Sequence, residues 1–91
     1  MKYKISPTNT FEKDVKKAFK RGYNIKLLNL IIDKLANGEI LEEKYKDHAL
    51  KGDYKGYREC HIAPDWLLIY KIYDDILVLT LSRTGSHSDL F

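Results

Sequence analysis

The chain has 91 residues, a formal charge of +3 and one cysteine, Cys60. Its length fits a single domain, and a hydrophobic content of 44% argues against intrinsic disorder. One cysteine excludes an intrachain disulfide. The first ten residues lack the apolar core of a signal peptide, and no apolar run approaches the length of a membrane span. We therefore expect a soluble, cytoplasmic protein with no membrane partner.

The N-terminal part of the chain predicts a strand and then a helix. Apolar residues alternate with lysines over residues 2–6, as in a half-buried strand, and Pro7 ends the pattern. Asn9 fits the N-cap of a helix and Gly22 fits its stop. The apolar stripe expected on this helix consists of Phe11, Val15, Ala18 and Phe19.

A second helix follows after a short link at Tyr23, which implies an antiparallel helical hairpin. Asn24 can cap this helix, and the Asn37-Gly38 pair can end it. Its expected buried stripe consists of Leu28, Ile31, Ile32 and Leu35. Residues 39–53 show no sustained periodicity and are interpreted as a long connection, which in a small domain is often functional.

The last part of the chain predicts three consecutive strands, "GYRECHI" (56–62), "WLLIYKIY" (66–73) and "ILVLTLSR" (76–83). The order β-α-α-β-β-β predicts a single α+β domain over residues 1–91. In it, a twisted antiparallel sheet carries a helical hairpin on one face. The other face would remain partly open and could receive a ligand.

Five polar residues lie close to predicted strand or loop ends: His48, His61, Asp65, Arg83 and His87. Ordinary surface histidines are the common alternative. Histidines, a carboxylate and an arginine also suit RNA cleavage by internal transesterification, in which the 2′-hydroxyl attacks the adjacent phosphorus. Histidine titrates near pH 6.5 and can serve as base or acid, while arginine can hold the phosphate.

Other chemistries fit the sequence less well. Cys60 and His61 are adjacent and would point to opposite faces of a strand, so they cannot form a nucleophile–base pair. We expect Cys60 to fill core space. No CxxC or helical HxxxH spacing supports a metal site, and no glycine-rich phosphate loop is present. We therefore expect neither a metal nor a cofactor.

Two segments carry a family resemblance. "DHALKGDYKGYRECHIAPDWLLIYK" (47–71) and "RTGSHSDLF" (83–91) closely resemble the YafQ branch of the RelE superfamily. These are bacterial type II toxins that cleave mRNA on the ribosome, and their topology agrees with the order predicted above. The resemblance implies a ribosome-dependent endoribonuclease that inhibits translation and is neutralised by a cognate antitoxin. A noncatalytic RNA- or protein-binding module is the alternative, but it leaves the five polar residues without a purpose.

The resemblance also implies roles for individual residues. The family's active-site positions are occupied here by His48, His61, Asp65, Arg83 and His87. His87 would be the general acid and Arg83 would hold the scissile phosphate. Asp65, His48 and His61 remain alternatives for the general base.

Two aromatic residues are candidates for substrate binding. Phe91 would lie beside the groove and stack on a base, a contact that contributes about 1–3 kcal/mol. A ring that only pins the tail to the sheet is the alternative. Trp66 starts a strand beside Asp65, and packing in the core or groove wall is favoured over base contact.

The charge is distributed unevenly along the chain. Residues 1–26 hold eight Lys or Arg against two acidic residues, a formal charge of +6, whereas the remainder carries −3. This asymmetry favours a polyanionic or acidic partner, although a solvated lysine-rich helix face is the alternative. Candidate contacts to ribosomal RNA or to the antitoxin are Lys13, Lys16, Lys17, Lys20 and Arg21. Operator DNA is expected to be bound only indirectly, through the antitoxin complex.

Overall fold

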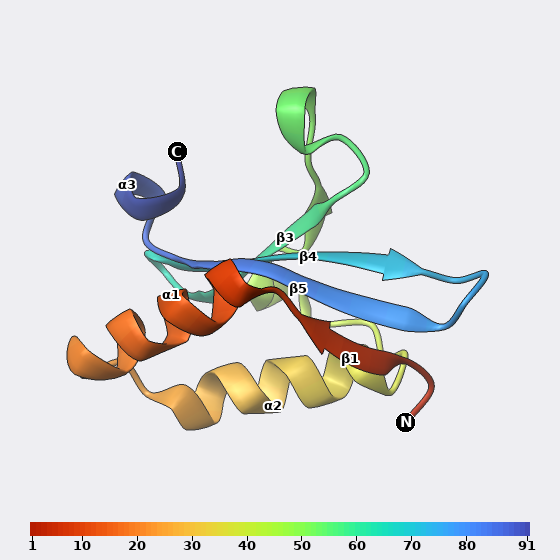
Figure 1. The fold of residues 1–91 in the computed structure, drawn as a ribbon, viewed down its shortest axis with the longest axis horizontal. Helices are drawn as coiled ribbons and strands as arrows, with labels where there is room; N and C mark the ends of the chain where they lie inside the picture. The colour runs from red at the N-terminus through yellow and green to blue at the C-terminus, as the bar shows by residue number, and fades with distance from the viewer.

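The computed structural model describes all 91 residues and places helices against a five-stranded sheet (Figure 1). The helices are α1 (Asn9–Lys20), α2 (Ile25–Ala36) and α3 (His87–Leu90). The strands are β1 (Lys4–Pro7), β2 (His48–Ala49), β3 (Arg58–Ala63), β4 (Trp66–Tyr73) and β5 (Val78–Gly85). Two 3-10 turns, η1 (Glu43–Tyr45) and η2 (Gly52–Tyr54), flank β2. The predicted α+β fold is confirmed, and no helix has the length and apolar character needed to cross a bilayer.

The strand order in the sheet is β1-β5-β4-β3-β2. The pairs from β2 to β5 are antiparallel, as expected, but β1 runs parallel to β5, with Lys4 opposite Val78. The sheet is therefore mixed, because the helical hairpin lies between β1 and the three-strand meander and brings β1 to the outer side of β5. Strand β2 has only two residues, which is too short for an alternating pattern to reveal it.

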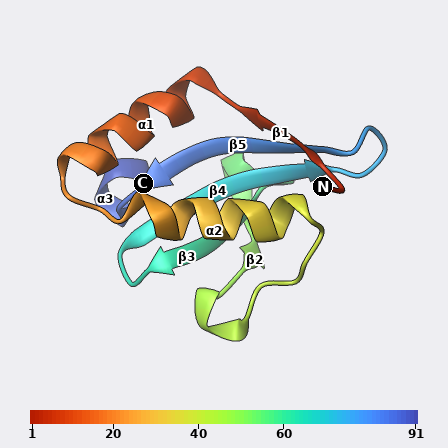
Figure 2. The same ribbon diagram turned by 90° about the horizontal axis from the view of Figure 1, so that it is seen from below.

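The two long helices lie on the same side of the sheet, with α1 packed along β5 (Figures 1 and 2). The predicted second helix is confirmed: Asn24 is its N-cap, and its whole expected stripe is buried. Helix α1 starts one position earlier than predicted, because the Thr8 side chain caps it by accepting from the Phe11 N–H. Phe19 is 71% exposed, contrary to prediction. It lies about 100° around the helix from Ala18, which packs inward.

Alternation along the strands divides the apolar residues between two faces. The larger cluster lies under the helices and includes Cys60, which is fully buried, as predicted for a core residue. Burial raises the pKa of this thiol to about 12, so the residue is not a nucleophile at neutral pH. On the opposite face, Leu67 and Ile69 are covered by Leu90 of α3. Leu50, Tyr54 and Tyr57 pack against the same cluster, so this second face is covered in part and otherwise open.

Two β-bulges adjust the strand register on either side of β4. The β3–β4 register shifts between His61 and Ala63, and the β4–β5 register shifts so that Arg83 pairs with Ile69. A bulge inserts one residue and re-aims the side chains that follow it. The second bulge turns Arg83 to the side of the sheet that faces away from the long helices. Strand β5 itself begins two positions later than predicted, because residues 76–77 belong to the preceding turn.

Candidate active site

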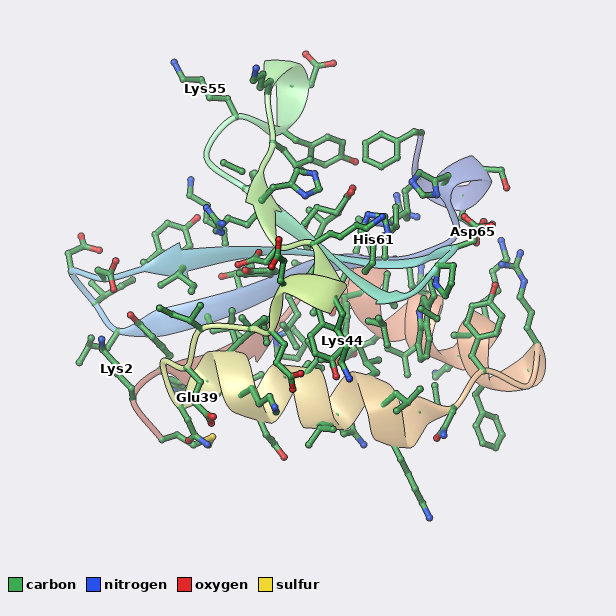
Figure 3. All side chains as sticks on the ribbon, turned by 180° about the vertical axis from the view of Figure 1, so that it is seen from behind. Lys2, Glu39, Lys44, Lys55, His61 and Asp65 are labelled. Atoms are coloured by element: carbon green, nitrogen blue, oxygen red, sulfur yellow. The ribbon has the colours of Figure 1, made fainter.

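Four predicted site residues converge at one end of the open sheet face. His48 lies on β2, His61 on β3 and His87 at the start of α3. The ring centroids are 6.4 Å apart for His48 and His61, and 5.8 Å apart for His61 and His87. Asp65 lies in the turn between β3 and β4, beside α3 (Figure 3). Residues from separate parts of the chain thus form one cluster.

Asp65 holds His87 through two hydrogen bonds. Its Oδ1 accepts from the backbone N–H of His87 at 3.0 Å and lies 2.8 Å from the ring Nδ1. These two bonds lower the pKa of the Asp65 carboxyl below its usual range, the backbone bond more than the ring bond. The contact therefore persists at neutral pH and weakens only as the pH falls through that lowered pKa. With Nδ1 against the carboxylate, the ring Nε2 is the nitrogen left to meet a substrate.

Glu59 is a site residue that the sequence analysis did not find. Its side chain is buried, with the whole residue 5% exposed, and Oε1 lies 3.5 Å from Nε2 of His48 and 3.7 Å from Nε2 of His61. A buried carboxylate needs polar or charged partners, and the two imidazoles supply them. The sequence did contain a signal for Glu59. Residues two apart in a strand share a face, and Glu59 precedes His61 by two. His48 is fixed from its other side, where Nδ1 lies 2.6 Å from the carbonyl oxygen of Lys46.

The same cluster offers donor atoms for a metal ion. Single ligand atoms of Glu59, His61 and His87 all lie within 4.8 Å of one another. A carboxylate with two imidazoles suits transition metals such as zinc or copper. No metal site was expected from the sequence, because the spacing of the ligands along the chain matches no metal motif. Here the donors come from two elements that only the fold brings together.

Arg83 already has a partner inside the protein. Its Nε donates to Oδ2 of Asp14 at 2.7 Å, and its Nη2 donates to Oδ1 at 3.2 Å. The backbone N–H of Thr84 donates to the same carboxylate at 3.2 Å. One edge of the guanidinium is therefore occupied by α1, and no hydrogen bond joins Arg83 to the histidines. A phosphate would meet the other edge, which carries Nη1.

The two aromatic candidates occupy different environments. Phe91 is 64% exposed, and its ring lies edge-on to Tyr54 of η2 at a centroid distance of 5.7 Å. Tyr54 is thus a second aromatic residue at the open face that the sequence analysis did not single out. Trp66 is only 4% exposed, donates from Nε1 to Oγ1 of Thr84 and packs against Tyr23. This burial fits the favoured core role and leaves no ring face for a base.

The basic residues of α1 fall into two groups. Lys13, Lys16 and Lys20 are exposed and make no ion pair. Lys17 and Arg21, which were expected to face a partner, instead reach Asp89 of α3, at 3.3 and 2.6 Å. A positive charge in the sequence therefore does not by itself mark a free surface contact.

Comparison with known proteins identifies the family. A family model described as a bacterial toxin of type II toxin–antitoxin systems, YafQ, matches residues 3–91. The chain belongs to the YafQ family. The mRNA interferase toxin YafQ of Escherichia coli K12 is 43% identical over 88 residues, covering 96% of this chain and 94% of that protein.

Solved structures of bacterial toxins share the fold. The E. coli DinJ–YafQ complex contains a chain that matches this YafQ-family protein with a TM-score of 0.90 and 42% identity, covering 98% of each chain. A metal-bound toxin from Helicobacter pylori matches with a TM-score of 0.92 and 46% identity, covering 98% of this chain and 99% of that one. The family resemblance seen in the sequence and the predicted fold class are both confirmed.

Proposed function

We propose that this YafQ-family toxin is a ribosome-dependent endoribonuclease that cleaves mRNA during translation. The arrangement of His87 carries the proposal: a carboxylate fixes one nitrogen of its exposed ring, beside a second cluster of two histidines and Glu59. One acid and one base on an open surface match the needs of internal transesterification. The relative described as an mRNA interferase supports the same reaction class.

The reaction divides the work between the two groups. The 2′-oxygen forms a bond to phosphorus as its proton passes to the base. The bond from phosphorus to the 5′-oxygen breaks as His87 donates a proton from Nε2 to that oxygen. Asp65 stabilises the charged imidazole before transfer and fixes its direction. The products are a 2′,3′-cyclic phosphate and a free 5′-hydroxyl, and the proposed step uses neither a covalent intermediate nor a metal.

The two hydrogen bonds of Asp65 favour a histidine over Asp65 as the proposed base. Asp65 is engaged by His87 through two hydrogen bonds, so its carboxylate acts as the support of the acid. His48 and His61 remain, and both have Nε2 near the same oxygen of Glu59. In the proposal this group of three removes the 2′-hydroxyl proton. Arg83 binds a phosphoryl oxygen through the guanidinium edge that Asp14 leaves uncovered.

Primer extension tests the proposal. The protein is added to an mRNA in a purified translation reaction and, in parallel, to the same RNA without ribosomes. Cuts only on the translated mRNA are expected. Cuts on both RNAs would overturn ribosome dependence, and no cuts from folded protein would favour the noncatalytic binding module.

Phe91 gives a prediction for substrate binding. Phe91→Ala should raise the ribosome concentration needed for half-maximal cleavage about 5- to 150-fold, because stacking on one base contributes about 1–3 kcal/mol. Phe91→Tyr keeps the ring and should retain most of the affinity. Ile76→Ala is the control, since it removes a similarly exposed apolar side chain from the β4–β5 turn, away from both proposed RNA contacts. Equal affinity for Phe91→Ala and the control would remove Phe91 from the substrate site.

The three unpaired lysines of α1 are proposed to contact ribosomal RNA. Replacing Lys13, Lys16 and Lys20 with Gln should weaken ribosome binding. The slope of log K against log salt concentration should become shallower by up to about three units, because each phosphate contact releases counterions. Sedimentation with ribosomes at several salt concentrations measures this. An unchanged slope would assign the lysines to the antitoxin or to solvent.

A cognate antitoxin is proposed as the inhibitory partner, as in the E. coli DinJ–YafQ complex, with operator DNA bound only through it. Co-expression with the DinJ protein of the E. coli complex and a pull-down would test this. Recovery of the toxin alone, with undiminished toxicity, would count against that partner.

A further inference from the structure

The segment that carries His87 is too short to hold its own conformation. Helix α3 has four residues, and an isolated helix of that length is unstable in water, because nucleation costs more than one turn returns. Phe91 follows it directly. The positions of both residues therefore depend on what anchors this single turn to the rest of the protein.

Some anchors lie within the turn or beneath it. Ser86 and Asp89 form a reciprocal capping box: Oδ2 of Asp89 accepts from the Ser86 N–H at 2.9 Å, and Oγ of Ser86 accepts from the Asp89 N–H at 3.2 Å. Leu90 is buried against Leu67 and Ile69 of β4. These contacts shape the turn and hold its far end on the sheet.

Besides the Asp65 contact to His87, a further anchor comes from the end of α1. Arg21 donates from Nη1 to Oδ2 of Asp89 at 2.6 Å and from Nη2 to Oδ1 at 3.1 Å, and Lys17 adds a contact of 3.3 Å. Exposed ion pairs usually contribute little to stability. The Arg21–Asp89 pair is bidentate, and the Asp89 side chain is only 15% exposed. The pair therefore fixes the orientation of the Asp89 carboxylate as well as its distance from Arg21.

The Asp89 side chain packs closely against the backbone at Gly85. A Cβ atom at position 85 would lie 3.0 Å from both Cβ and Oδ2 of Asp89, which is closer than ordinary packing allows. Asp89 is thus held between the end of β5 and the guanidinium of Arg21. Only one residue separates it from His87 and from Phe91, so a shift of Asp89 moves both.

We propose that Asp89 is a positioning residue of the active site, and that its pairing with Arg21 fixes the turn so that His87 meets Asp65 and the substrate. The effect on cleavage rests on the proposed function, whereas the effect on His87 does not. Lys17 and Arg21, which the sequence suggested as contacts to a partner, thereby stabilise the turn that carries His87.

Two single variants and their combination test the proposal. Asp89→Asn keeps an acceptor for the Ser86 N–H but loses the charge, and Arg21→Gln removes the pair from the other side. Glu42→Gln is the control, because it removes an exposed pair with Lys34, at 3.8 Å, away from the site. The first readout is the ¹⁵N shifts of the His87 ring and their pH titration in the free protein. The second is the maximal cleavage rate and half-saturation on programmed ribosomes.

We expect both single variants to change the His87 ring shifts and to lower the maximal rate about tenfold or more. Half-saturation should also rise, because Phe91 moves with the same turn. A misplacement of about 1 Å can cost 10²-fold. The double variant should be no worse than either single one, Arg21→Lys should recover part of the rate, and the control should match the wild type. Gly85→Ala should resemble Asp89→Asn.

Unchanged His87 shifts and rates in Asp89→Asn would overturn the proposal, and so would losses that multiply in the double variant. Changed His87 shifts in a protein that never cleaves RNA would support the positioning role and overturn the proposed function instead. Because the ring shifts are measured on folded protein below its unfolding temperature, a less stable variant still gives an answer.

Discussion

His87→Gln should lower the rate of mRNA cleavage by about 10²- to 10⁴-fold while leaving the fold intact. His87 is exposed, with 54% of its side chain accessible, so glutamine can occupy its place without leaving a core cavity. Without the imidazole, the 5′-oxygen must leave as an unprotonated alkoxide. Single-turnover cleavage of a translated mRNA measures the rate, and circular dichroism with thermal unfolding verifies the fold.

An RNA with a better leaving group distinguishes the residue that acts as general acid from the residue that acts as general base. An mRNA with sulfur in place of the 5′-bridging oxygen releases a thiolate, whose conjugate acid has a pKa near 8.5 and needs little protonation. This RNA should restore most of the rate of His87→Gln but not that of His61→Gln or His48→Gln. Full activity of His87→Gln on normal RNA, or equal rescue of all three variants, would contradict the assigned role.

Trp66→Ala should destabilise the protein by about 3–5 kcal/mol, because it removes a large ring from the core. Trp66→Phe should cost about 1 kcal/mol, the net value of the lost hydrogen bond from Nε1 to Thr84. That smaller loss corresponds to a fall of roughly 4–8 °C in the unfolding midpoint of a domain this size. Urea and thermal unfolding measure both effects.

The phenylalanine variant also tests the substrate-binding prediction for Trp66. If Trp66 is a core residue, folded Trp66→Phe should keep the wild-type half-saturation for ribosomes. A large loss of affinity at unchanged stability would instead show that the indole contacts RNA. Phe91→Ala is the comparison, because it should lose affinity with little change in stability.

Local patterns predicted most of the elements. Strand β4 matches its expected range, and α2 has the predicted cap and buried stripe, because both follow from residues that are near in sequence. The N-cap at Thr8 and the exposed Phe19 differ from prediction, since neighbouring residues offered equally good patterns and tertiary packing decided between them. The parallel pairing of β1 with β5 could not be predicted, because it depends on where β5 lies in the folded sheet.

The candidate site, too, was predicted in part from local sequence and was set in part by contacts between distant residues. His48, His61, Asp65 and His87 were candidates from the sequence, and the structure brings them together. Glu59 was missed although strand alternation pointed to it. The partners of Arg83 and Arg21 could not be predicted, because Asp14 and Asp89 lie 69 and 68 positions away and nothing local marks them.

The long separation of these ion pairs has a consequence for synthesis. Helix α1 is translated nearly 70 residues before the segments that it holds. At 5–20 residues per second this is a delay of roughly 4–14 s. During that time Asp14 and Arg21 have no partners, β1 has no strand to pair with, and His87 does not yet exist. A nascent chain therefore cannot assemble the site, and the toxin acquires it only late in its own translation.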